Sequence, residues 1–136
     1  MRTLSTVFVA VSIFILSGCS SQSLEVPVPI SQPLPTVPSE YAGNTIPSNV
    51  DVNVGANLFK TDCVACHGES GHGDGPASQA LDPRPANLVD LNKISADDFL
   101  FWKISTGVTG TAMPAWKGIF TDQQIWQVIA FIRTLK

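Results

Sequence analysis

The residues best suited to chemistry lie in the segment CVACH, at positions 63–67. Two cysteines separated by two residues lie about one helical turn apart, and a histidine follows directly. Cys-x-x-Cys-His is the attachment signature of c-type haem, in which two thiols add to the vinyl groups of one porphyrin edge. We therefore predict that Cys63 and Cys66 carry one covalent haem c and that His67 binds its iron.

Two other kinds of site use closely spaced cysteines, and the remaining sequence disfavours both. A thioredoxin-like redox pair belongs between a strand and a helix of an α/β fold, but no alternating strand pattern of useful length occurs here. A structural zinc site needs four ligands. The segment 50–136 offers two cysteines and two histidines, with no second pair at ligand spacing. Haem attachment is the preferred interpretation.

A methionine is expected as the second iron ligand. Apart from the initiator, the only methionine is Met113, in the segment GTAMPAW, where Pro114 favours an extended loop. The other histidine, His72, follows His67 by five residues in a glycine-rich loop on the same side of the porphyrin, and it is expected at the surface. Histidine and methionine ligands raise the reduction potential and fill both axial positions. This predicts one-electron transfer, and an open or otherwise ligated iron is the alternative.

Three helices are expected to position these residues. The first, within residues 51–67, leads directly into the cysteine pair. Ser95 and Asp98 have capping-box spacing at the start of a second helix, which Gly107 would end. A third follows a similar box at Thr121 and repeats apolar residues at i, i+3, i+4 and i+7: Ile125, Val128, Ile129 and Ile132.

Long loops rich in glycine and proline join these helices, at residues 68–86 and 107–118. Loops of this length inside a small domain commonly bind something. Because the segment 50–136 has fewer than 90 residues, its own core is small and a bound group would help to complete it. The predicted fold class is all-α, with three to four helices and long loops around one covalently bound haem.

The N-terminal end of the chain has the features of an export signal. Residues 1–18 contain Arg2 and then an apolar run of about ten residues, which is too short to span a bilayer. An uncleaved anchor or a buried helix is the alternative. The segment LSGC, ending at Cys19, resembles the lipobox of bacterial lipoproteins. Cys19 would then be the lipid-modified N-terminus of the exported protein.

Residues 19–49 are predicted to link this lipidated cysteine to a folded domain at residues 50–136. Six of the ten prolines lie in this stretch and favour an extended backbone, which could reach about 90 Å as a spacer. A docking arm along a partner protein is the alternative. The full chain has 8 basic and 11 acidic residues. Removal of residues 1–18 takes away one basic residue and leaves a net charge of −4. This charge argues against a nucleic-acid partner.

Together these features resemble a class I cytochrome c over nearly all of the predicted domain. Besides CVACHG and TAMPAW, the likeness includes Gly55 and Phe59, eight and four residues before Cys63. It also includes Trp126 and Phe131 in the last expected helix. The resemblance implies that the glycine and the aromatic residue let the first helix cross the last at close range.

The resemblance also implies surroundings for the haem. The loop GESGHGDGPASQALDPRPANL resembles that of a subset of bacterial monohaem cytochromes, in which a proline carbonyl accepts a hydrogen bond from the iron-binding histidine. Pro76, Pro83 and Pro85 compete for this role, and Pro85 is preferred. Arg84 is a candidate partner for a haem propionate, or else a solvated surface side chain.

For function, the resemblance implies a membrane-tethered electron carrier in a respiratory or photosynthetic chain. It would face the periplasm or another extracytoplasmic compartment and take no small-molecule substrate. Its partners would be a quinol-oxidising complex, a terminal oxidase or a reaction centre. The lipobox, linker and single domain also resemble the monohaem lipoprotein subunit of alternative complex III, so a fixed subunit of such a complex is the alternative. An enzyme or gas sensor with a labile Met113 is disfavoured, because no acid–base pair is expected on that side of the iron.

Overall fold

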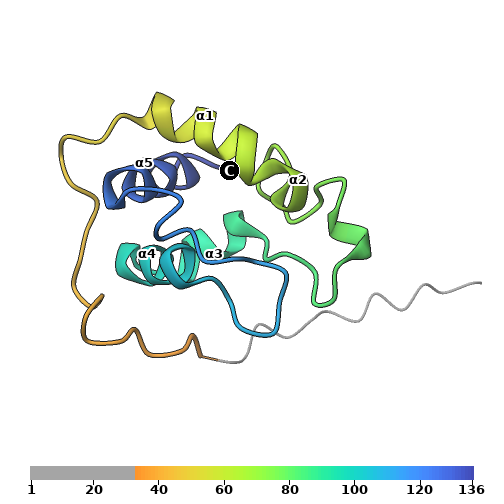
Figure 1. Ribbon diagram of the computed structural model, residues 1–136, viewed down its shortest axis with the longest axis horizontal. Coiled ribbons are helices and arrows are strands. Elements are labelled where there is room, and N and C mark those ends of the chain that lie inside the picture. The colour runs from red at the N-terminus through yellow and green to blue at the C-terminus, as the bar shows by residue number, and fades with distance from the viewer. Residues whose placement is uncertain (1–32) are drawn as a thin grey trace, which may run out of the picture. The chain divides into compact units, whose positions relative to one another are not determined.

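The computed structural model describes residues 33–136 and is drawn in Figure 1. The predictions for residues 1–18 and Cys19 lie outside the described residues. Between Pro33 and Lys136 the chain forms no β-strand, which confirms the all-α class. None of the helices in this range is long and apolar enough to cross a bilayer. The elements are α1 (Val52–Asp62), α2 (Val64–His67), the 3-10 turn η1 (Ser78–Ala80), α3 (Leu88–Ile94), α4 (Asp97–Thr106) and α5 (Asp122–Ile132).

Helices α1 and α5 cross in direct backbone contact. A Cβ atom at Gly55 would overlap the backbone carbonyl of Gln127, so only glycine fits at this point. One turn later Phe59 is buried, and its ring packs against that of Phe131 with 5.1 Å between the centroids. The close crossing expected from the glycine and the aromatic residue is therefore present.

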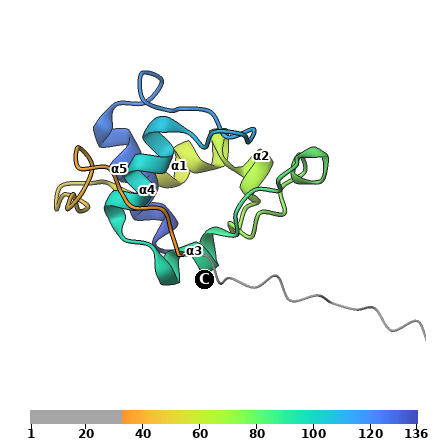
Figure 2. The ribbon, with the colours of Figure 1, turned by 90° about the horizontal axis from the view of Figure 1, so that it is seen from below.

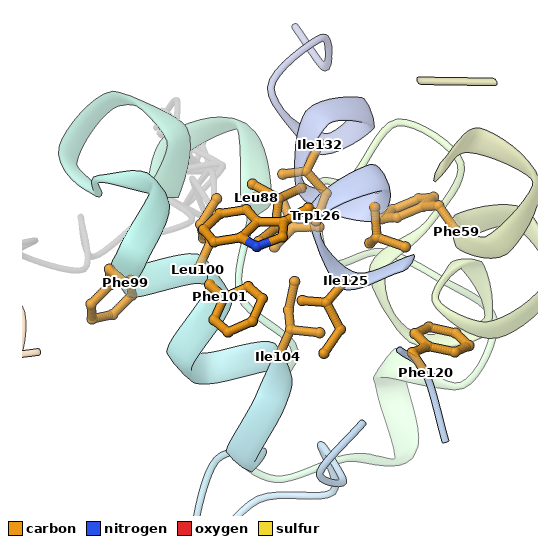
Figure 3. Close-up of a cluster of buried hydrophobic side chains, with 12 residues drawn as sticks. Phe59, Leu88, Phe99, Leu100, Phe101, Ile104, Phe120, Ile125, Trp126 and Ile132 are labelled. Atoms are coloured by element: carbon orange, nitrogen blue, oxygen red, sulfur yellow. The ribbon is translucent and has the colours of Figure 1, made fainter. Parts of the chain in front are cut away.

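The core lies mainly between α4 and α5 (Figure 3). Trp126 of α5 stacks on Phe101 of α4, with 4.3 Å between the ring centroids and 20° between the planes. Aromatic pairs in this arrangement contribute beyond the area that they bury. The other buried apolar residues of the cluster are Phe59, Leu88, Phe99, Leu100, Ile104, Phe120, Ile125, Val128, Ile129 and Ile132.

The expected boundaries of α5 and the end of α4 are confirmed. The Thr121 hydroxyl accepts from the backbone N–H of Gln124 at 3.2 Å, and the Gln124 side chain accepts from the backbone N–H of Thr121 at 2.9 Å. This reciprocal pair satisfies two donors that a helix start leaves unpaired. At the end of α4, Gly107 has φ of 70° and stops the helix.

The capping box predicted at Ser95 and Asp98 is wrong. Helix α4 is capped by Ala96, which has no side-chain oxygen, and Ser95 instead ends α3, a helix that the sequence did not predict. The Ser95 hydroxyl donates to the Leu91 carbonyl at 2.8 Å. The Asp98 carboxylate accepts from the backbone N–H of Gly43 at 2.8 Å. The Ser95 side chain is thus used at the end of α3 and that of Asp98 in a contact with the N-terminal segment. The capping-box spacing reveals neither contact.

The second half of the predicted linker belongs to the folded unit, which runs from Pro33 to Lys136. We call residues 33–50 the N-terminal arm. The Tyr41 ring lies 6.2 Å from that of Phe101, and the backbone N–H of Ile46 donates to Asp97 at 3.4 Å. Apolar side chains between the prolines of this arm pack on the core: Leu34, Val37, Tyr41, Ile46 and Val50.

We predict that Gly55→Ala lowers the free energy of unfolding by about 3 kcal/mol, the upper end of what overpacking typically costs. Alanine is the better helix former, so the same change at an open helix position would raise stability by about 1 kcal/mol. Urea unfolding of the haem-containing protein measures the difference. Asn57→Ala, at an exposed position of the same helix, is the control and should change stability little. Equal stability of the Gly55 variant and the wild type would contradict the close crossing.

Candidate functional site

The four residues expected to bind haem line one cavity of about 320 Å³. Cys63, Cys66 and His67 reach it from the junction of α1 and α2, and Met113 reaches it from the loop between α4 and α5. Figure 2 shows α2 and the following loop facing α3 and α4 across this part of the molecule. The rest of the wall is mostly apolar and includes Phe59, Leu81, Leu88, Leu91, Phe99, Leu100, Ile104, Val108, Trp116, Phe120, Val128 and Ile132.

Cys63 caps the start of the single-turn helix α2, and Cys66 lies within it. Cys63 ends α1, and its carbonyl accepts from the backbone N–H groups of Cys66 at 3.2 Å and His67 at 2.9 Å. Both thiols are free rather than joined in a disulfide. Burial raises the pKa of Cys63 to about 12, with smaller contributions from Asp62 and Cys66. Such a thiol stays protonated at neutral pH, unlike the thiolate of a redox-active pair.

The His67 ring is half-buried and held in one orientation. Its Nδ1 lies 3.1 Å from the backbone carbonyl of Ala86. A carbonyl can only accept, so Nδ1 carries the proton and Nε2 keeps a free lone pair for a metal. Burial lowers the pKa of His67 below its ordinary value, and the hydrogen bond to Ala86 opposes this only in part. The geometry favours the neutral imidazole that binds metals.

The expected proline acceptor for His67 is wrong by one residue. Pro85 lines the cavity, but a Cβ at Gly73 would overlap the Pro85 carbonyl oxygen, so that carbonyl lies against the glycine loop. The next carbonyl, that of Ala86, is the one that reaches His67. Of the other two candidates, Pro83 lines the cavity and Pro76 does not. The sequence missed Ala86 because no residue type marks a backbone acceptor.

Glycine is required where the loop after α2 passes the segment 83–86. Gly73 has φ of 76°, in the left-handed region, and its N–H donates to the His67 carbonyl at 2.8 Å. The loop is also joined to the start of α3, because the Leu88 N–H donates to the Gly71 carbonyl at 2.7 Å. These contacts hold the Ala86 carbonyl beside His67. His72, in the same loop, is exposed and lies outside the cavity wall, as expected.

Met113 is fixed by its own loop rather than by a helix. Its N–H donates to the Thr111 hydroxyl at 3.1 Å, and its carbonyl accepts from the Val108 N–H at 3.2 Å. The loop is joined back to α4 by the Trp116 N–H, which donates to the Ile104 carbonyl at 3.0 Å. The side chain is half-buried in the cavity wall, so the loop predicted around Pro114 does place Met113 at the site.

Three charged side chains line the cavity: Asp62, Arg84 and Lys103. Arg84 lines the cavity but its side chain is exposed to solvent, so both alternatives that the sequence left for it stay open. Lys103 was not singled out from the sequence. Its spacing from Phe99 and Leu100, four and three residues earlier in α4, could have placed it on the same helix face.

Comparisons with known proteins identify a family and similar chains. Residues 50–132 match the family described as "Cytochrome C oxidase, cbb3-type, subunit III". A cytochrome c6 from Parathermosynechococcus lividus is 29% identical over 82 residues, which cover 60% of this chain and 87% of the relative.

Two solved structures are similar to the chain. The Kuenenia stuttgartiensis reducing HAO-like protein complex Kustc0457/Kustc0458 has a TM-score of 0.56 and 22% identity, with 77% of this chain covered. The chain spans 47% of that structural neighbour. Cytochrome cL from Methylophaga aminisulfidivorans has a TM-score of 0.48 and 25% identity, over 61% of this chain and 53% of that one.

The fold and the site together define a monohaem c-type cytochrome that binds haem c covalently. Because this family match covers more than half of the sequence, the chain belongs to the family of cbb3-type cytochrome c oxidase subunit III. The general function of this class is electron transfer. The predicted cytochrome c fold and the predicted cofactor are therefore confirmed.

We predict that the domain depends on its cofactor for stability. Without the haem, the apolar residues of the cavity wall would be exposed to water. A domain of this size has a small core of its own and a small free energy of unfolding. A Cys63→Ala/Cys66→Ala variant, made without haem, should lose most of its helical circular dichroism relative to the haem-containing wild type. Unfolding of both proteins at the same urea concentration would contradict this.

Proposed function

We propose that this protein is an exported electron carrier, tethered to a membrane by lipid at Cys19, in a respiratory or photosynthetic electron transport chain. The observation that carries the proposal is the cavity at the junction of α1 and α2. Two thiols, an imidazole and a thioether, from segments about fifty residues apart, line the same apolar cavity. This set of side chains is what a covalently attached haem with two axial ligands requires.

In this proposal Cys63 and Cys66 form the two thioether bonds, while His67 and Met113 bind the iron. Haem c supplies a one-electron couple between the ferric and ferrous states. With both His67 and Met113 holding the iron, the chain would leave no position on the metal for a substrate. The apolar wall limits water around the centre and favours a higher reduction potential.

The hydrogen bond from His67 to Ala86 has two consequences for the proposed ligation. It fixes the tautomer that leaves Nε2 free, and it holds the plane of the ring. A backbone carbonyl accepts this hydrogen bond without bringing a full negative charge, so the imidazole gains less electron density than it would from a carboxylate. A neutral imidazole opposite a thioether suits a carrier of moderately high potential.

The membrane tether is proposed from the sequence of the first 49 residues. Residues 1–18 would direct export and Cys19 would carry the lipid, which places the domain on the periplasmic or extracytoplasmic side. A tethered carrier meets its partners at a high effective concentration, so weak contacts suffice for electron exchange. The proposed partners are a quinol-oxidising complex, a terminal oxidase or a reaction centre.

A fixed subunit of a quinol-oxidising complex, as in alternative complex III, is the competing proposal. On that hypothesis residues 20–50 would pack against neighbouring subunits. In the described part of this segment, residues 33–50, apolar side chains and backbone donors are instead used within the chain's own domain. This supports the carrier. Extraction from native membranes in mild detergent, followed by size-exclusion chromatography, distinguishes the two, because a carrier elutes alone and a subunit with other chains.

We predict that Met113→Ala keeps its covalent haem but loses the far-red ferric absorption band of sulfur-ligated iron. Its reduction potential should also fall, because the thioether favours the ferrous state. Val108→Ala is the control, since Val108 lines the same cavity from the same loop without a ligating atom. That control should keep the band. A band that survives in the Met113 variant would exclude Met113 as the ligand.

A further inference from the structure

Two cations in the cavity wall have no carboxylate partner. Within residues 33–136 the ion pairs join Lys93 to Asp90 and Arg133 to Asp97, both outside the cavity. Neither Arg84 nor Lys103 forms an ion pair in this part of the chain. The other basic residues described, Lys60, Lys117 and Lys136, do not line the cavity.

The Lys103 ammonium lies over two aromatic rings, of which Phe99 lines the cavity and Trp102 does not. Its Nζ lies 3.6 Å from the centroid of the Trp102 ring and 5.6 Å from that of Phe99. A cation over an aromatic face is attracted by the negative potential of the ring. The side chain is half-exposed, while Phe99, Leu100 and Ile104 of the same helix are buried in the wall. Lys103 therefore lies at the edge of the apolar cavity wall, with its ammonium group over the Trp102 ring.

The charges at the cavity match the chemistry of the cofactor. A haem carries two propionates on the porphyrin edge opposite its vinyl groups, and a carboxylate next to an apolar wall is stable only with a charged or hydrogen-bonded partner. The one acidic side chain in the wall, Asp62, precedes Cys63 at the attachment edge. Arg84 comes from the loop before α3 and Lys103 from α4, and α4 faces α2 in Figure 2.

We propose that Lys103 and Arg84 are the cationic partners of the two haem propionates, and that Lys103 thereby raises the reduction potential. This inference rests on the proposed placement of the haem in this cavity. A fixed ammonium neutralises a propionate and disfavours the additional positive charge of ferric iron. Because Lys103 is partly exposed, its contribution is expected in the range of a surface ion pair.

The test compares Lys103→Met with Lys60→Met, which removes the same charge from an exposed position on α1 outside the cavity. Methionine keeps most of the apolar stem of the lysine. We expect Lys103→Met to shift the redox equilibrium about threefold towards the ferric form, which is about 28 mV at 59 mV per tenfold. Lys60→Met should change it much less. Lys103→Arg should restore the wild-type potential, and adding Arg84→Gln to Lys103→Met should lower the potential further.

The pH dependence of the potential separates a propionate partner from a general charge effect. When a propionate loses its partner cation its pKa rises, so the pH at which the potential begins to fall should move upwards in Lys103→Met. Removal of a distant charge shifts the whole curve without moving that point. Asp62 is the only other carboxylate in the wall, and an Asp62→Asn variant should keep the wild-type pH dependence. Loss of the dependence in that variant would overturn the assignment.

Other outcomes are equally clear. Potentials that agree in Lys103→Met and Lys60→Met, with haem attached and the sulfur band intact, would overturn the role of Lys103 and leave the proposed function standing. If the Met variant does not accumulate, Lys103→Gln serves for the same comparison. A wild-type protein without haem or without the sulfur band would overturn the proposed ligation, and this inference with it.

Discussion

The site depends first on the backbone contact between α1 and α5. Gly55 brings the two helices together without a side chain between them, and Phe59 closes the space one turn later. From that crossing, the remaining two turns of α1 end at Cys63, at the cavity wall. A wider crossing would move the cysteines away from the core formed by α4 and α5. The contact thus sets the position of the attachment residues relative to the rest of the cavity.

The side chains proposed to bind iron are oriented by loops, whereas helices build most of the apolar wall. The glycine loop after α2 positions the Ala86 carbonyl on His67, and the loop after α4 holds Met113 through Thr111 and Val108. Backbone groups in loops are free to bond in this way because no helix uses them. The division lets helix packing provide a rigid, dry wall while short hydrogen bonds fix the directions of the polar groups.

Much of this arrangement could be predicted from local sequence. The motif at residues 63–67, the single candidate Met113 and the capping box at Thr121 are contained within a few neighbouring residues, so their spacing is informative. The Ala86 carbonyl could not be predicted, because the choice between it and Pro85 is made by the close approach of Gly73. The box at Ser95 failed because α3 ends there, where the Ser95 hydroxyl bonds to the Leu91 carbonyl, and because Asp98 bonds to the distant Gly43.

The N-terminal arm has a consequence for how far the electron can be carried. If all of residues 19–49 were a free linker, the haem could reach a wide range of distances from the bilayer. Residues 33–50 are instead committed to the domain surface, which leaves residues 20–32 between the proposed lipid and the first docked residue. The covalent limit for that stretch is about 50 Å. With the proposed tether, any donor or acceptor would have to bring its own redox centre to the domain within that distance of the membrane.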